Sequence, residues 1–205
     1  MKQIKAILFD LGRVIVGVHL DKLAAGLSEY GKFREKDLLE YCSESRNYNF
    51  YQEGKITSSQ FYARTVKIFR LRVKYNEFYN VWNSILTHSP EMEKIIRGIR
   101  KKYPDIKMVL ISDTNKAHFE FIKEEYDILD ELDDCVVSYE VGKQKPTAKI
   151  FNEALKRAGS LPKDALYVDD RLDLIKGGRV MGIRSHQFTG AEAFREQLAK
   201  FDILV

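Results

Sequence analysis

The sequence has few cysteines, little net charge and no long apolar run, and each of these absences excludes a class of protein. Among its 205 residues are only two cysteines, Cys42 and Cys135, which lie far apart in unrelated contexts. We therefore expect neither a disulfide framework nor a zinc site, and such thiols suit a reducing compartment. No apolar run approaches the roughly 20 residues that a membrane-spanning helix needs.

The net charge and the residues at the N-terminus give no indication of a nucleic-acid-binding or secreted protein. The formal net charge is +4, and lysine and arginine are spread along the chain, so nothing indicates a nucleic-acid surface. The first apolar run is short and is interrupted by Asp10, which is not typical of a signal peptide. We expect a cytoplasmic protein that binds neither nucleic acid nor membrane and is a monomer or a weak homodimer.

Short strand-like runs alternate with helical patterns along most of the chain. The apolar runs are 6–9, 108–111, 135–137 and 165–168, with a weaker fifth at 182–185. Helical patterns between them cover about 91–101, 115–126, 147–158 and 172–181. This alternation predicts an α/β fold, a Rossmann-like three-layer core in which helices cover both faces of a parallel sheet.

The segment between the first two strands is too long for a single crossover helix. Helical patterns recur in it at about 20–30, 35–45, 58–69 and 75–86. We interpret residues 16–88 as a helical cap inserted over the strand ends, which leaves 1–15 and 89–205 for the core. The many aromatic side chains of the cap are expected to be its packing core, with Tyr48 and Tyr51 as the candidates to face a substrate instead.

Chemically active residues follow the predicted strands. Asp10 ends the first strand and Ser112 the second, Lys145 precedes a helix, and the pair Asp169 and Asp170 ends the fourth strand. Each one alone is compatible with a helix cap or a solvated loop. Because parallel strands end at one edge of a sheet, all of them are expected to converge there. Paired acids after an apolar run are costly to bury without a cation.

The order of these motifs resembles the haloacid dehalogenase superfamily, whose members are mostly magnesium-dependent phosphatases. The resemblance covers the whole chain and includes a helical cap between the first and second motifs. It is similar to the branch that contains sugar-phosphate phosphatases such as bacterial α-D-glucose-1-phosphate phosphatase. The phrases that carry it are FDLGRV at 9–14, EGKIT at 53–57, SDTN at 112–115 and KP at 145–146.

The resemblance implies roles for the strand-end residues. Asp10 would attack phosphorus and form an aspartyl-phosphate, which divides one difficult displacement into two easier ones. Ser112 and Asp113, with nearby backbone N–H groups, would bind the phosphoryl group. Lys145 would offset its charge during catalysis.

The same resemblance implies a Mg²⁺ site. Its expected ligands are Asp10, the backbone carbonyl of Gly12 and Asp170, with Asp169 as a direct or water-mediated ligand. A carbonyl ligand does not depend on the side chain, so a glycine at position 12 is compatible with this site.

The sequence departs from the family pattern at that same position. Many relatives carry a second aspartate two residues after the nucleophile, which protonates the leaving oxygen, and Gly12 cannot do so. General acid–base help of this kind is worth roughly 10²–10⁴ in rate. His19 is a candidate replacement, the alternative being a residue at the start of a cap helix. Arg13 either binds substrate phosphate or points outward.

Three functions remain open at this stage. The first is a Mg²⁺-dependent phosphatase that acts on a small phosphorylated metabolite, such as a sugar phosphate. The second is a metal-independent haloacid dehalogenase, which would leave the acidic pair Asp169 and Asp170 unexplained. The third is a non-catalytic phosphate-binding relative that lost turnover together with the acid at position 12.

Overall fold

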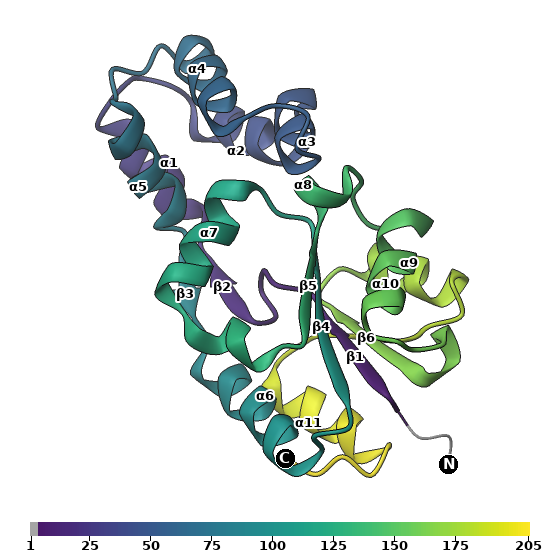
Figure 1. Cartoon of the computed structure of the whole chain (residues 1–205). Helices are drawn as coiled ribbons and strands as arrows, with labels where there is room; N and C mark the ends of the chain where they lie inside the picture. The colour runs from purple at the N-terminus through teal and green to yellow at the C-terminus, as the bar shows by residue number, and fades with distance from the viewer. Residues whose placement is uncertain (1–3) are drawn as a thin grey trace.

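A five-stranded parallel sheet forms the centre of the computed structural model, which describes residues 4–205 (Figure 1). The strand order is β5-β4-β1-β6-β7. The strands are β1 (Ala6–Phe9), β4 (Lys107–Ser112), β5 (Asp134–Val137), β6 (Ala165–Asp169) and β7 (Arg184–Gln187). All four residues of the central strand β1 are fully buried, as expected for a strand covered on both faces.

Helices cover both faces of the sheet, so the predicted three-layer α/β fold is confirmed. Ile7 and Phe9 of β1 belong to one apolar cluster, while Ala6 and Leu8 belong to another, because successive side chains of a strand point to opposite faces. The first face packs against α6 (Pro90–Lys102), α7 (Lys116–Glu125) and α11 (Ala191–Ala199). The second packs against α9 (Ala148–Arg157) and α10 (Leu172–Val180).

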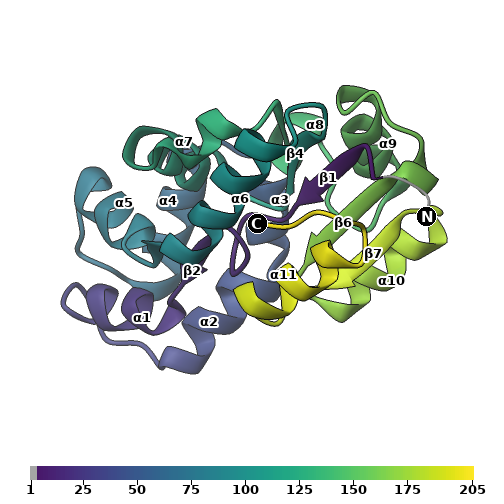
Figure 2. The ribbon, with the colours of Figure 1, turned by 90° about the horizontal axis from the view of Figure 1, so that it is seen from below.

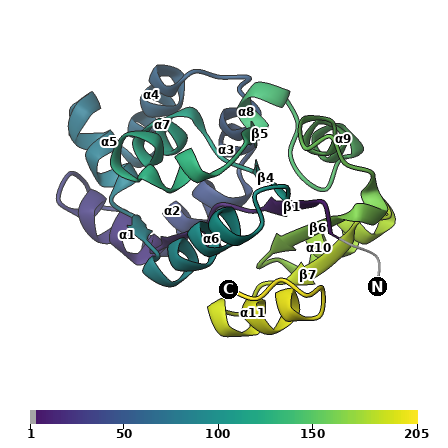
Figure 3. The same ribbon diagram turned by 60° about the horizontal axis from the view of Figure 1, so that its bottom comes forward.

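The views from below show the same layers. Figure 2 places α6 and α11 side by side, and Figure 3 shows both helices on the side of the sheet away from α9. The five predicted strands and the helices α6, α7, α9 and α10 begin and end within two residues of the expected ranges. The short helix α8 (Ser138–Val141) and α11 were not predicted.

A group of helices lies beyond the carboxyl ends of the strands (Figure 1). We call residues 20–83 the helical insertion; it comprises α1 (Leu20–Ser28), α2 (Glu35–Glu44), α3 (Arg46–Gln52), α4 (Ser58–Phe69) and α5 (Tyr75–Asn83). Phe61 is fully buried among the rings of Tyr41, Tyr51 and Trp82. Most of the aromatic side chains in this segment are thus packing residues, as the amphipathic pattern indicates.

A two-stranded sheet that the sequence did not predict joins the insertion to the core. β2 (Val16–Val18) pairs antiparallel with β3 (Leu86–His88), so the two ends of the inserted segment lie side by side. These strands coincide with the ends of the expected cap, 16–88, although the division into two domains stays a prediction. Within residues 4–205, none of the helices combines the length and apolar character that crossing a membrane requires.

The insertion also rests on the core through α8. Gly54 has a φ of 66°, and a Cβ atom there would lie 2.1 Å from the carbonyl oxygen of Tyr139. The Ser138 hydroxyl donates a hydrogen bond to the carbonyl of Gln52 at 2.6 Å. Only glycine accommodates both this backbone conformation and this close approach. The contact fixes the end of α3 against the loops at the edge of the sheet.

Candidate active site

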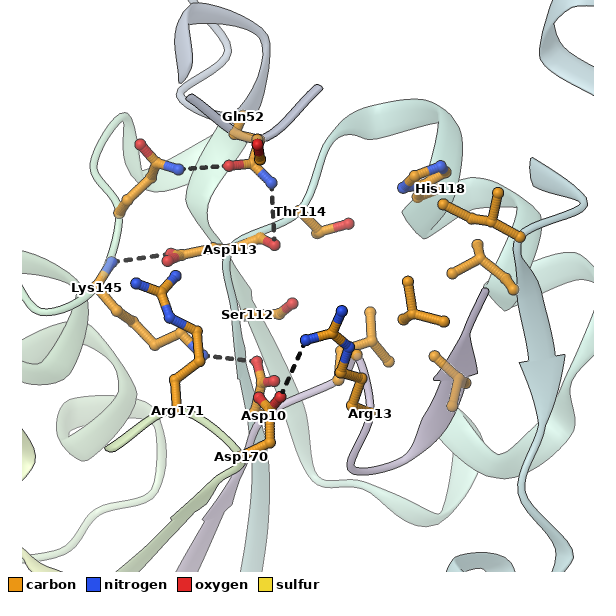
Figure 4. Close-up of a pocket in the computed structure, with 18 of the residues that line it drawn as sticks. Asp10, Arg13, Gln52, Ser112, Asp113, Thr114, His118, Lys145, Asp170 and Arg171 are labelled. Carbon is orange, nitrogen blue, oxygen red and sulfur yellow. Dashed lines mark hydrogen bonds and ion pairs between the residues drawn. The ribbon is translucent and has the colours of Figure 1, made fainter. Parts of the chain in front are cut away.

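A cavity of about 450 Å³ lies between the strand ends and the helical insertion. Its floor is formed by the loops that follow β1, β4 and β6, and its walls by β2, β3 and helices of the insertion (Figure 4). The sheet explains the convergence, because parallel strands deliver their carboxyl ends to a single edge. Of the residues expected at the site, the cavity is lined by Asp10, Gly12, Arg13, Ser112, Asp113, Lys145 and Asp170.

Lys145 lies at the centre of the charged groups, with its side chain almost fully buried. Its ammonium donates hydrogen bonds to Asp10 Oδ1 at 2.6 Å, to Asp169 Oδ2 at 2.7 Å and to the carbonyl of Ile111 at 3.1 Å. Burial acts to lower the pKa of Lys145, but the carboxylates around it, Asp10 foremost, raise that pKa well above its usual value. All three donors of a charged ammonium are therefore engaged.

The backbone of Lys145 is held as firmly as its side chain. Asp113 Oδ1 accepts a hydrogen bond from Lys145 N at 2.8 Å, which ties the loop after β4 to the loop before α9. One oxygen of the Asp113 carboxylate thus orients Lys145. Phosphate binding by Asp113 stays a prediction.

Three carboxylates gather around this lysine. One oxygen each from Asp10, Asp169 and Asp170 lies within 4.8 Å of the others. Burial raises the pKa of Asp10 above its ordinary value, and the Lys145 ammonium opposes that rise. Even with Arg13 beside Asp170, three acids facing two cationic side chains leave negative charge uncompensated, and carboxylate oxygens are the ligands that Mg²⁺ prefers. The donor set therefore fits a divalent cation.

The two adjacent aspartates have different surroundings. Asp169 is fully buried; its Oδ2 accepts hydrogen bonds from Lys145 and the Tyr167 hydroxyl, and its Oδ1 accepts one from Arg171 N at 2.9 Å. Asp170 is partly exposed and lines the cavity. Both oxygens of Asp169 are thus engaged within the protein, which suits a residue that positions Lys145. Direct ligation by Asp169 stays a prediction.

The turn after Asp10 brings Arg13 to the cavity. Arg13 has a φ of 61°, which is uncommon for a residue with a side chain, and its N–H donates to Val16 O at 2.6 Å. Its guanidinium lies 3.6 Å from Asp170 Oδ2, with the side chain 56% exposed. Figure 4 shows this guanidinium above Asp10 and Asp170, inside the cavity. Its guanidinium thus lies at the cavity beside Asp170, and phosphate binding by Arg13 stays a prediction.

His19, the candidate replacement for the missing acid, lies outside the cavity. It is exposed, it is not among the cavity-lining residues, and its Nε2 is 3.1 Å from Thr87 Oγ1. The short pairing of β2 with β3 brings it beside Thr87, which is the cross-strand partner of Gly17. The hypothesis that His19 replaces the missing acid therefore has no support in the structure.

Three of the cavity residues that were not anticipated from the sequence carry notable contacts. Gln52 donates from Nε2 to the Tyr48 hydroxyl at 2.9 Å and bonds through Oε1 with Gln144, so it joins the insertion to the loop of Lys145. Arg171 pairs with Asp173 at 2.6 Å. Arg171 directly follows Asp170 in the sequence, and this position could have indicated that it lies at the site. Nothing in the sequence around Gln52 indicated the same for that residue. Of the two tyrosines expected to face a substrate, Tyr48 lines the cavity, while Tyr51 is buried in the aromatic cluster.

His118 is the third of these residues. Its Nε2 donates to the carbonyl of Trp82 at 3.0 Å, and its Nδ1 therefore accepts from the Asn115 amide at 3.1 Å. Burial lowers the pKa of His118 to about 4. The ring is neutral at pH 7, and both its nitrogens are engaged.

Comparison with known families and proteins identifies relatives over most of the chain. The model of a family described as haloacid dehalogenase-like hydrolase matches residues 4–182. A D-ribitol-5-phosphate phosphatase from Bacteroides thetaiotaomicron is 26% identical over 203 residues, which covers 95% of this chain and 97% of that protein. A glyceraldehyde 3-phosphate phosphatase from Methanopyrus kandleri is 47% identical over 51 residues, 24% of this chain and 22% of its own.

Solved structures share the fold. A haloacid dehalogenase family enzyme from Bacteroides thetaiotaomicron has a TM-score of 0.82 at 22% identity and covers 95% of this chain and 100% of its own. The wild-type form of that family enzyme in complex with magnesium and inorganic phosphate has a TM-score of 0.78 at 22% identity, with 90% and 93% covered. A hydrolase of the same fold from Porphyromonas gingivalis has a TM-score of 0.82 at 20% identity and covers 97% of both chains.

Proposed function

The chain belongs to the haloacid dehalogenase-like hydrolase family, and we propose that it is a Mg²⁺-dependent phosphatase acting on a small phosphorylated metabolite, a sugar phosphate. The observation that carries this proposal is the buried ammonium of Lys145 between the carboxylates of Asp10 and Asp169, at the floor of a cavity. The names of the two relatives, both phosphatases of small phosphorylated compounds, support it.

Asp10 is the proposed nucleophile. Its carboxylate oxygen forms a bond to phosphorus while the ester P–O bond breaks, and the leaving oxygen departs into the cavity with the electron pair of that bond. Water then attacks the phosphorus of the aspartyl-phosphate, which releases inorganic phosphate and restores the carboxylate. Lys145 holds Asp10 by the 2.6 Å hydrogen bond and keeps a positive charge beside the transferring group.

Asp10, Asp170 and the Gly12 carbonyl are the proposed ligands of Mg²⁺, with Asp169 behind them. The ion, when bound, supplies positive charge that neutralises the phosphate oxygens. Ser112, buried at the end of β4, is proposed to bind the phosphoryl group with neighbouring backbone N–H groups. Arg13, with its guanidinium inside the cavity, is proposed to offset the charge of the bound substrate.

The leaving oxygen takes its proton from water in this proposal. Gly12 offers no acid, His19 lies outside the cavity, and both nitrogens of His118 are engaged. Leaving groups that need little protonation, such as an anomeric or acyl phosphate oxygen, are therefore favoured.

Phosphate release tests the proposal. Ribitol 5-phosphate, glucose 1-phosphate and p-nitrophenyl phosphate are incubated with the protein, with and without Mg²⁺. We expect Mg²⁺-dependent release that Asp10→Asn abolishes and that Asp105→Asn, in an exposed turn, leaves unchanged.

The other functions have distinct outcomes. Chloride release from a 2-haloacid without Mg²⁺ would instead establish a dehalogenase. Phosphate binding without turnover of any substrate would establish a non-catalytic relative.

A further inference from the structure

The charged residues of the cavity are confined to the floor that surrounds Asp10. Within residues 4–205 the lining residues with charged side chains are Asp10, Arg13, Asp113, Lys145, Asp170 and Arg171. All of them belong to loops of the α/β core, and the two arginines already face carboxylates, Arg13 that of Asp170 and Arg171 that of Asp173. This floor is where the phosphoryl group is placed by the proposed function.

The walls above that floor are uncharged. Among the described lining residues, those that come from positions 16–88 have only neutral side chains. One part of the wall carries amides and hydroxyls from α2 and α3, including Ser43, Asn49 and Gln52. Another part is hydrocarbon from β2 and the segment at β3, including Val18, Ile85 and Leu86.

The two kinds of wall lie apart. Figure 4 shows Gln52 and His118 apart from each other, with His118 on the side where the strands β2 and β3 lie. His118 contributes no charge, because Trp82 O and the Asn115 amide occupy its nitrogens. The apolar side is completed by Ile122, which is on α7 together with His118.

We propose that the substrate's leaving group is uncharged, with hydroxyl groups toward the amide wall and a hydrocarbon face toward β2 and β3. This inference rests on the proposed function and adds the class of leaving group. A carboxylate or ammonium that entered this part of the cavity would lose water without gaining a counter-ion, which is strongly unfavourable. Hydroxyl groups can exchange water for the side chains of Ser43 and Asn49, so a neutral sugar or polyol loses little.

A matched set of phosphates tests this. Glucose 1-phosphate, glucuronate 1-phosphate and glucosamine 1-phosphate share a ring and differ in charge; ribitol 5-phosphate and ribonate 5-phosphate form an open-chain pair. Each is measured as a competitor of p-nitrophenyl phosphate hydrolysis, so that a poor substrate still gives an inhibition constant. We expect the neutral member of each set to bind at least about tenfold more tightly than its charged analogues.

Charge introduced into the wall should change this preference. In Asn49→Asp, a change without added bulk, the ratio of the glucuronate to the glucosamine inhibition constant should rise about tenfold or more. Asn152→Asp adds the same charge on the exposed surface of α9 and should leave the ratio unchanged.

Two results would overturn the inference. One is charged analogues that bind as well as neutral ones, and the other is an Asn49→Asp ratio equal to that of Asn152→Asp. Failure of the proposed function appears separately, as absence of Mg²⁺-dependent p-nitrophenyl phosphate hydrolysis.

Discussion

Replacing Gly12 by aspartate would supply the acid that the active site lacks. Gly12 lines the cavity two residues after Asp10, and its backbone does not adopt a positive φ. A Cβ atom at this position would lie 3.2 Å from Val18 Cγ2. This is a few tenths of an ångström closer than ordinary contact, so the side chain of Val18 must shift slightly. Overpacking of this kind costs about 1 kcal/mol, the lower end of its usual range.

The expected gain is larger than that cost. A positioned general acid contributes roughly 10²–10⁴ in rate, or about 3–5 kcal/mol of activation free energy. We therefore expect Gly12→Asp to raise kcat for ribitol 5-phosphate, whose alkoxide leaving group needs protonation. It should hardly change kcat for p-nitrophenyl phosphate, whose leaving group does not. Combining it with Val18→Ala, which removes the contacting methyl group, should increase the gain.

The assay compares Gly12→Asp with Gly12→Asn. Asparagine has nearly the same size and the same contact with Val18, but it cannot donate a proton as an acid. Phosphate release is followed at saturating Mg²⁺, and the thermal midpoint of each variant verifies its fold. If the aspartate and asparagine variants, both folded, hydrolyse ribitol 5-phosphate equally slowly, then the cavity at position 12 does not face the leaving oxygen and the reasoning is wrong.

Three further predictions concern stability. Lys145→Met leaves two buried carboxylates without their ammonium and should lower the free energy of unfolding in urea by about 3–5 kcal/mol, which Asp169→Asn in the same chain should partly restore; an unchanged urea midpoint would contradict the buried ion pairs. Gly54→Ala should destabilise by about 1–3 kcal/mol more than Gly142→Ala, because both have positive φ but only position 54 has a carbonyl in the way. Equal thermal midpoints for these two variants would count against the contact. The pKa of His118 is lowered to about 4 in the folded protein, whereas an unfolded histidine titrates near 6.5. As the pH falls below about 6.5, the unfolded state therefore binds a proton that the folded state does not, and the free energy of unfolding decreases. Between pH 8 and pH 5 this loss should be about 2 kcal/mol, and urea unfolding of His118→Gln should lack it.

The sequence by itself determined the layers of the fold and the residues on the floor of the cavity. Apolar runs of three or four residues alternate with amphipathic helices, and a chain with that pattern can bury its apolar surface only by covering both faces of a parallel sheet. Once the sheet is parallel, Asp10, Ser112 and Asp170 must meet at one edge. For that reason their convergence was predictable from the strand ends, whereas Lys145 follows β5 only after the intervening helix α8.

Side-chain direction was decided only by the tertiary structure. His19 and Arg13 are close in sequence and both were candidates, yet one turns toward Thr87 and the other into the cavity. β2 and β3 have three residues each, too few for a periodic pattern, and their pairing determines where His19 points.

Contacts between segments that are distant in the sequence could not be predicted from it. Gln52 meets the loop of Lys145 only because the helical insertion rests on α8, and that contact depends on the glycine at position 54. The periodicity of apolar residues predicts which face of a single helix or strand is buried. Which polar side chains of another segment arrive opposite it depends on packing between segments, and so the neutral walls of the cavity were visible only in the folded chain.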